Sequence, residues 1–107
     1  PSVTAEVASV VRGEAMELRI ENPTSVDWDF WICGVSILQR FERGTWVDTP
    51  PPFTDCAPSS PRVLAGESLQ RFAHVPNEFR TGPYRAKLTF RSGDRTAVVF
   101  SRVFAVR

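Results

Sequence analysis

The chain has 107 residues, enough for one domain with one hydrophobic core but too few for a second core. Its apolar content of 42% excludes a disordered chain, and no apolar run approaches the length of a membrane span. Thirteen basic and twelve acidic residues give a net charge of +1 with the two signs interleaved, which argues against the concentrated basic surface that nucleic-acid binding needs. We therefore expect a single domain over residues 1–107.

Short stretches typical of β-strands, bounded by turn residues, fill most of the chain. In chain order they cover residues 3–11, 16–21, 28–33, 35–41, 45–47, 63–64, 68–75, 82–90 and 96–106. The clearest is Gly82 to Phe90, where apolar and polar side chains alternate as in a half-buried strand. The alternation slips near Ala8-Ser9, as it would at a β-bulge, and Arg102 interrupts the last stretch, where we expect a bulge or an exposed end.

No segment carries the apolar stripe of an amphipathic helix, and the chain has no internal repeat. Many short strands separated by turns are typical of a β-sandwich or a small β-barrel. Of these two architectures we favour the sandwich. The sequence therefore predicts an all-β fold with about seven to eight mostly antiparallel strands.

The two cysteines, Cys33 and Cys56, are not spaced as in a CxxC redox or zinc motif. Cys33 ends a predicted strand, and Cys56 lies in a long irregular, proline-rich segment from Asp48 to Pro61. A loop flanked by prolines is a poor place to bury a free thiol, so we favour a Cys33–Cys56 disulfide and an oxidising compartment. The alternative is two unrelated buried thiols in a cytosolic protein.

The sequence offers little for catalysis or metal binding. His74 is the only histidine, and the cysteines that would complete a metal site are expected to bond to each other. No motif places Ser68 or Ser101 as a nucleophile for that histidine. Asp27 and Asp29 lie two residues apart next to a turn, which is typical of a solvated face. We therefore expect a protein that is not an enzyme and that uses neither a metal nor a cofactor.

The tryptophans provide one candidate binding surface. Trp31 and Trp46 are the candidates for an aromatic surface that stacks on a sugar or on a partner side chain. The alternative is that one or two of the three tryptophans fill the core and one covers a hairpin. Trp31 is the one that we expect to be exposed, because it faces away from Phe30.

The proline-rich segment provides a second candidate, centred on Pro52, Phe53, Thr54 and Asp55. A stiff loop with an exposed phenylalanine has the build of an inhibitory loop, because rigidity lowers the entropy lost on binding. The alternative is a strand crossover pinned by its disulfide, in which Phe53 plugs the end of the core. We favour the crossover.

The order of several short motifs resembles a known family. The motifs are Asn22-Pro23-Thr24, Leu38-Gln39-Arg40, Gly44-Thr45-Trp46, Leu64-Ala65-Gly66-Glu67 and Gly82-Pro83-Tyr84-Arg85. Together they resemble the bacterial immunoglobulin-like domains of secreted proteins and lipoproteins, and their layout is similar to that of the BsuPI intracellular proteinase inhibitors. The resemblance implies an immunoglobulin-like β-sandwich in which Tyr84 is a structural tyrosine whose hydroxyl bonds to nearby backbone. The cysteine pair favours the secreted immunoglobulin-like domains over the intracellular inhibitors.

We therefore expect a non-catalytic structural or interaction module, stabilised by one disulfide and located outside the cytoplasm, as a secreted, periplasmic or cell-surface domain. The chain starts at Pro1 without a signal peptide, and because it lacks an initial methionine we expect it to have been processed or trimmed. The expected partner is another protein or a component of the cell envelope, not nucleic acid. The alternatives are a proteinase inhibitor acting through residues 48–61 and a carbohydrate-binding module that uses exposed tryptophans.

Overall fold

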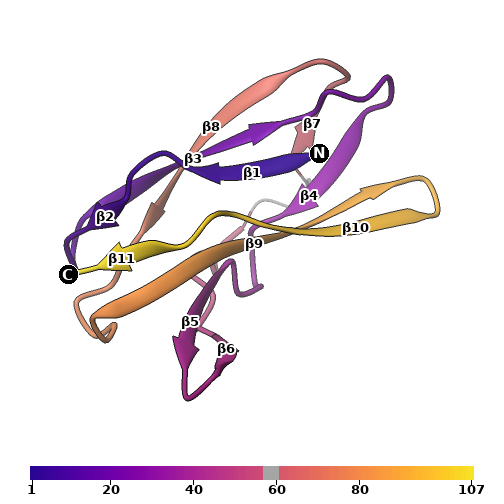
Figure 1. Cartoon of the computed structure of the whole chain (residues 1–107). Helices are drawn as coiled ribbons and strands as arrows, with labels where there is room; N and C mark the ends of the chain where they lie inside the picture. Colours follow the sequence, from indigo (N-terminus) through magenta and orange to yellow (C-terminus); the bar gives the residue numbers. More distant parts are fainter. Residues whose placement is uncertain (57–60) are drawn as a thin grey trace.

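The computed structural model describes residues 1–56 and 61–107, and these residues form strands and connecting loops without a helix (Figure 1). The strands are β1 (Ser2–Ala5), β2 (Ser9–Val10), β3 (Ala15–Glu21), β4 (Trp28–Trp31), β5 (Leu38–Glu42), β6 (Thr45–Asp48), β7 (Arg62–Val63), β8 (Ser68–His74), β9 (Gly82–Ser92), β10 (Arg95–Phe100) and β11 (Phe104–Val106). The all-β prediction is confirmed.

The strands form two sheets that pack face to face as a sandwich. The smaller sheet has the antiparallel order β1-β3-β8. The larger sheet is built on β9, the longest strand, which pairs with β11 and β10 along one edge and with β5 and β4 along the other (Figure 1). Strands β6 and β7 extend this sheet through β5 and β4, and β2 extends it through β11. Residues 82–90, the clearest strand prediction, therefore lie in β9 at the centre of the larger sheet.

The first predicted strand, residues 3–11, is divided between the two sheets instead of carrying a bulge. Strand β1 pairs with β3 in the smaller sheet, and β2 pairs with β11 in the larger sheet, where it is parallel. The slip in the alternation at Ala8 marks this change of sheet. It lets Val3, Ala5 and Val10 all point into the core, because the two halves face the core from opposite layers.

The last predicted strand, residues 96–106, is divided into β10 and β11, and Arg102, where we expected a bulge or an exposed end, lies between them. There the backbone amide of Ala86 donates to the buried Ser101 hydroxyl at 2.8 Å, which takes the place of a ladder hydrogen bond. The Arg102 side chain turns towards β1, where its Nε donates to the carbonyl oxygen of Ala5 at 3.0 Å. The break therefore ties the last strands of one sheet to the first strand of the other.

The hydrophobic core lies between the sheets and receives the inward side chains of both. At its centre Phe30 of β4 and Phe90 of β9, both fully buried, have ring centroids 5.8 Å apart. Trp28 is also buried, and its indole nitrogen donates to the Thr24 hydroxyl at 3.1 Å. Of the three tryptophans, this one fills the core.

Asn22 is a buried polar residue, 1% exposed, at the end of β3. The two protons of its side-chain amide nitrogen are shared among the carbonyl oxygens of Val26, Val63 and Leu64, at 2.8, 3.2 and 3.0 Å. Its side-chain oxygen accepts hydrogen bonds from the amide and the hydroxyl of Thr24 at 3.1 and 2.6 Å. One side chain thus joins the turn after β3 to the segment after β7, two of the motifs on which the family resemblance rests.

Tyr84 is fully buried in β9, and its hydroxyl donates to the carbonyl oxygen of Arg80 at 2.7 Å. Its ring lies between those of Phe79 and Phe104, with centroid separations of 5.6 and 6.3 Å. The hydroxyl therefore fixes the turn into β9 while the ring packs in the core.

Replacing Tyr84 with phenylalanine is expected to lower the free energy of unfolding by about 1 kcal/mol, because the ring stays and one buried hydrogen bond is lost. Urea unfolding of the wild type and of Tyr84→Phe measures this difference. An unchanged unfolding midpoint would show that the hydroxyl does not hold the turn.

Candidate functional site

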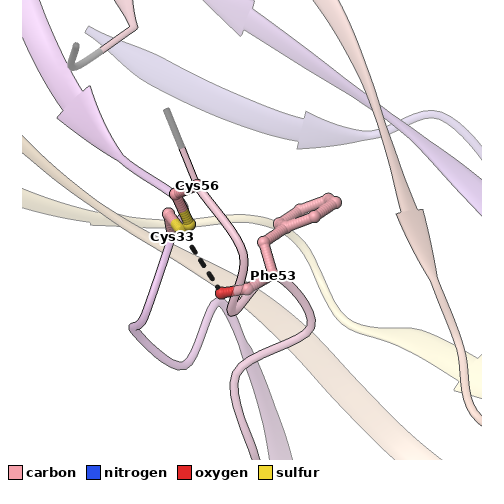
Figure 2. Close-up of a disulfide and its surroundings, with 3 residues drawn as sticks. All are labelled: Cys33, Phe53 and Cys56. Carbon is pink, nitrogen blue, oxygen red and sulfur yellow. Dashed lines mark hydrogen bonds between the residues drawn. A yellow bond between two sulfur atoms is a disulfide. The ribbon is translucent and has the colours of Figure 1, made fainter. Parts of the chain in front are cut away.

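The disulfide joins Cys33, just after β4, to Cys56 in the proline-rich segment, with the two Cα atoms 6.1 Å apart (Figure 2). Beside it, Cys33 and Phe53 form an isolated parallel bridge, and the amide of Gly34 donates to the carbonyl oxygen of Phe53 at 2.7 Å. The Cys33 sulfur lies 3.4 Å from the same oxygen, as a contact, because a disulfide sulfur has no proton to donate. The disulfide and the bridge together fasten the proline-rich segment to the sandwich.

The four residues proposed as a binding loop have different environments. Thr54 and Asp55 are exposed, whereas Pro52 is half-buried and Phe53 packs against the hydrophobic core. The Phe53 side chain points away from the disulfide (Figure 2). Residues 57–60 of the predicted 48–61 segment lie outside the described part of the chain. The placement of Phe53 supports the pinned crossover more than a free inhibitory loop.

Replacing Phe53 with alanine is therefore expected to lower the free energy of unfolding by about 2 kcal/mol, since a partly buried ring is removed from the edge of the core. Replacing the exposed Asp55 with alanine is the matched control and should leave stability within about 0.5 kcal/mol. Thermal unfolding of both variants gives the comparison. If Phe53→Ala were as stable as the wild type, the ring would contribute nothing to the core, and the inhibitory-loop hypothesis would regain support.

The residues considered for catalysis do not form a common site. His74 is exposed on the edge strand β8, and the Ser101 hydroxyl is buried and bonded to backbone. Asp29 forms an ion pair with Arg62, with 2.9 Å between Oδ1 and Nε. Asp27 instead accepts a hydrogen bond from the backbone amide of Ala65. Within residues 1–56 and 61–107, no group of three histidine, cysteine or acidic side chains is placed to hold a metal ion.

The outer face of the larger sheet gathers the side chains with most potential for binding. Along β9, Tyr84, Ala86, Leu88 and Phe90 are buried, so the alternate side chains point away from the core. The strand register adds their neighbours, and the outer face comprises Asp29, Trp31, Gln39, Phe41, Trp46, Asp48, Arg85, Lys87, Thr89, Arg91, Thr96, Val98 and Phe100.

Four of these residues, Phe41, Trp46, Arg85 and Phe100, form what we call the aromatic–arginine cluster. The Arg85 guanidinium carbon lies 4.4 Å from the ring centroid of Trp46 and 3.8 Å from that of Phe100. The rings of Phe41 and Trp46 are 5.1 Å apart. Arg85 is also held by a 2.8 Å hydrogen bond from its Nε to the side-chain oxygen of Gln39. The cluster is exposed yet fixed in position, with Phe41 and Phe100 each more than 40% exposed.

A second feature of the outer face is a groove with a volume of about 540 Å³. It exists because β4 and β5 pair with the same edge of β9, while the chain between them leaves the sheet. The side chains that line it include those of Trp31, Ser36, Asp48, Lys87, Thr89 and Arg91. Trp31 and Trp46 therefore belong to separate features, since Trp31 pairs with Thr89 and Trp46 covers Arg85.

A second cavity, of about 390 Å³, lies under the three consecutive prolines beside Arg40 and Phe79. Glu42 accepts hydrogen bonds from Arg40 at 2.6 Å and from Arg80 at 3.2 Å, and these lower the pKa of its carboxyl group below the usual value. Arg40, which lines this cavity, is thus paired with a carboxylate through its Nη2, while its buried Nε has no hydrogen-bond partner among the described residues. That leaves the outer face as the stronger candidate site.

A scan of known protein families finds no match for this chain, and a search of curated proteins finds none either. Among the residues that the structure describes, none belongs to a helix long and apolar enough to cross a membrane.

Sequence reasoning identified the two outer-face tryptophans but missed Gln39, Phe41, Arg85 and Phe100. These residues come from β5 and from the distant hairpin of β9 and β10. The alternation of β9 does show that Arg85 points outward, but only the strand register shows which rings lie beside it.

Proposed function

We propose that this chain is a non-catalytic immunoglobulin-like interaction module of an exported bacterial protein or lipoprotein, and that it binds another protein of the cell envelope. Three features support the immunoglobulin-like assignment: the first strand is shared between the sheets, Trp28 is buried on β4, and the Tyr84 hydroxyl bonds to backbone four residues upstream. The disulfide differs from that of antibody domains, because it joins a strand end to a loop rather than two sheets. It supports an oxidising compartment.

The aromatic–arginine cluster is the observation that carries the proposal. Tryptophan and arginine are enriched among the few residues that dominate binding energy at protein interfaces. Here both are held in place by neighbouring side chains, so little conformational entropy would be lost when a partner binds.

The charge of the cluster indicates what the partner presents. The hydrogen-bond acceptor of the Arg85 Nε is the neutral amide of Gln39, and no carboxylate pairs with Arg85 within the described part of the chain. A partner surface with apolar side chains around an acidic group would complement the flanking rings and the unneutralised charge.

The experiment compares three immobilised proteins for capture from an envelope extract of the producing bacterium: the wild type, Trp46→Ala and Phe72→Ala. Phe72 is the matched control, because it is 61% exposed on the outer face of the smaller sheet. We expect one protein to be captured by the wild type and Phe72→Ala, and Trp46→Ala to bind it at least about tenfold more weakly. Equal capture by all three proteins, or none, would contradict the proposal.

The inhibitor alternative has less support, because Phe53 packs against the core. The carbohydrate-binding alternative concerns a different part of the outer face, and it is developed below from the groove.

A further inference from the structure

We propose that the groove on the outer face binds an acidic saccharide, a carbohydrate whose sugar rings carry carboxylate groups. This site lies beside the aromatic–arginine cluster but is built from other residues. It does not depend on the protein partner proposed above. A groove of about 540 Å³ is within the range of ligand sites in proteins.

The groove is rigid because its floor and its wall are fixed independently. The floor is the outward row of Lys87, Thr89 and Arg91 on β9. This row pairs with β10 on one edge, and on the other it is held by β4 at Thr89 and Arg91 and by the 2.8 Å hydrogen bond from the Lys87 amide to Ile37. The wall is Trp31 together with the segment that follows Cys33. The disulfide and the 2.7 Å hydrogen bond from Gly34 to Phe53 hold this segment. Such a preformed site loses little entropy when a ligand binds.

The groove combines an aromatic ring with hydroxyl groups, as a sugar ligand requires. The half-buried Trp31 ring provides an apolar surface for the C–H face of a pyranose ring. Thr89 and Thr96 also line the groove, and a threonine hydroxyl is able both to donate to and to accept from a sugar hydroxyl. An aliphatic ligand would leave these polar groups unsatisfied.

The charge of the groove indicates carboxylates on the sugar. Lys87 and Arg91 lie four residues apart on the same face of β9, a separation of about 13 Å. Arg91 stacks near Trp31, with its guanidinium carbon 5.7 Å from the ring centroid, and it forms no ion pair within the described part of the chain. Lys87 has only a long contact with Asp48, at 3.7 Å, and that carboxylate already accepts a hydrogen bond from Gln39. Both cations are therefore available to a ligand carboxylate.

An acidic peptide fits the groove less well than a saccharide. Extended peptides gain much of their affinity by adding a strand to a free sheet edge. The floor of the groove is one face of β9, whose backbone there pairs with β10 on one edge. On the other edge it pairs with β4 at Thr89 to Arg91, and the Lys87 amide donates to the carbonyl oxygen of Ile37. A peptide would have to bind here through side chains alone, whereas a saccharide uses its ring faces and hydroxyls.

The test is isothermal titration calorimetry of the whole chain with oligomers of galacturonate, mannuronate and glucuronate. The matching neutral oligomers of galactose, mannose and glucose are the ligand controls, and hexaglutamate is the peptide control. We expect at least one uronate oligomer to bind, and its neutral counterpart to bind at least about tenfold more weakly.

Two groove variants and two controls locate the site. Arg91→Gln and Trp31→Ala should each weaken uronate binding at least about tenfold, and Arg91→Gln is the safer variant because the side chain is exposed. Arg95→Gln removes an exposed charge outside the groove lining, and Trp46→Ala removes the centre of the aromatic–arginine cluster. Both should leave uronate binding unchanged.

Several outcomes would overturn the proposal. Binding of none of the uronates would exclude an acidic saccharide, and equal binding of neutral and acidic sugars would exclude the role of the cations. Stronger binding of hexaglutamate than of every uronate would identify an acidic peptide instead. An equal loss of uronate affinity in Arg91→Gln and Arg95→Gln would show that the uronate is attracted by the overall charge of the protein and not bound at the groove. Because Trp46→Ala is a control here, failure of the saccharide site and failure of the protein-binding cluster are distinguishable.

Discussion

Replacing Asn22 with alanine is expected to lower the free energy of unfolding by about 3 kcal/mol. The substitution removes an amide that is 1% exposed and that donates to three backbone carbonyl oxygens. Those oxygens lie in two segments separated by more than 30 residues; that of Val63 is buried and those of Val26 and Leu64 are partly buried, and all three would lose this partner. The cost therefore comes mainly from polar groups left unsatisfied, not from the small volume removed.

Two further variants separate hydrogen bonding from packing at this position. Asn22→Asp keeps the shape but places an acceptor oxygen against the three carbonyl oxygens, so it should be at least as destabilising at neutral pH as alanine. Ser25→Ala changes an exposed residue in the same turn and should alter stability by less than about 0.5 kcal/mol. Urea unfolding of the three variants provides the free energies. A loss below about 1 kcal/mol for both Asn22 variants would mean that the network does not join the two segments.

Replacing both cysteines with alanine is expected to lower the free energy of unfolding by about 3 kcal/mol. The disulfide closes a loop between residues 23 apart in sequence, and removing it allows the unfolded chain more conformations. It also releases the Cys33–Phe53 bridge, which holds the proline-rich segment against the core. The double variant Cys33→Ala/Cys56→Ala avoids leaving a single reactive thiol.

Reduction of the wild type provides the matched control for this second prediction. The reductant should shift the wild-type unfolding curve to that of the double variant and leave the double variant itself unchanged. Unfolding curves that coincide for wild type and double variant without reductant would contradict a stabilising disulfide.

Most strands were predictable because one face of each is buried, and burial imposes the apolar and polar alternation that the sequence shows. Strand β9 is the clearest case, with four consecutive inward positions fully or almost fully buried. The cysteine pair was predictable for a related reason, since a proline-rich loop seldom encloses a free thiol. The break at Arg102 followed from a charged residue on an apolar face.

Long-range pairing was not predictable from local pattern. The change of sheet between β1 and β2 depends on β3 and β11, which lie elsewhere in the chain. The predicted strands at residues 28–33 and 35–41 are shorter in the structure, because the chain leaves the sheet between Trp31 and Leu38. This departure creates the groove. The candidate site was therefore only half visible in the sequence, which shows outward tryptophans but not the arginine and phenylalanine side chains that surround them.

Photo-crosslinking in the bacterial host that the proposed function assigns to this chain tests most directly whether the aromatic–arginine cluster is a protein-binding surface. A photoreactive phenylalanine analogue replaces Val98, which is 49% exposed on the outer face next to Phe100, or Phe72 on the opposite sheet. We expect one crosslinked envelope protein from position 98, its loss when Trp46 is also replaced with alanine, and no such product from position 72. Equal products from the two positions, or a product at position 98 that survives Trp46→Ala, would contradict it.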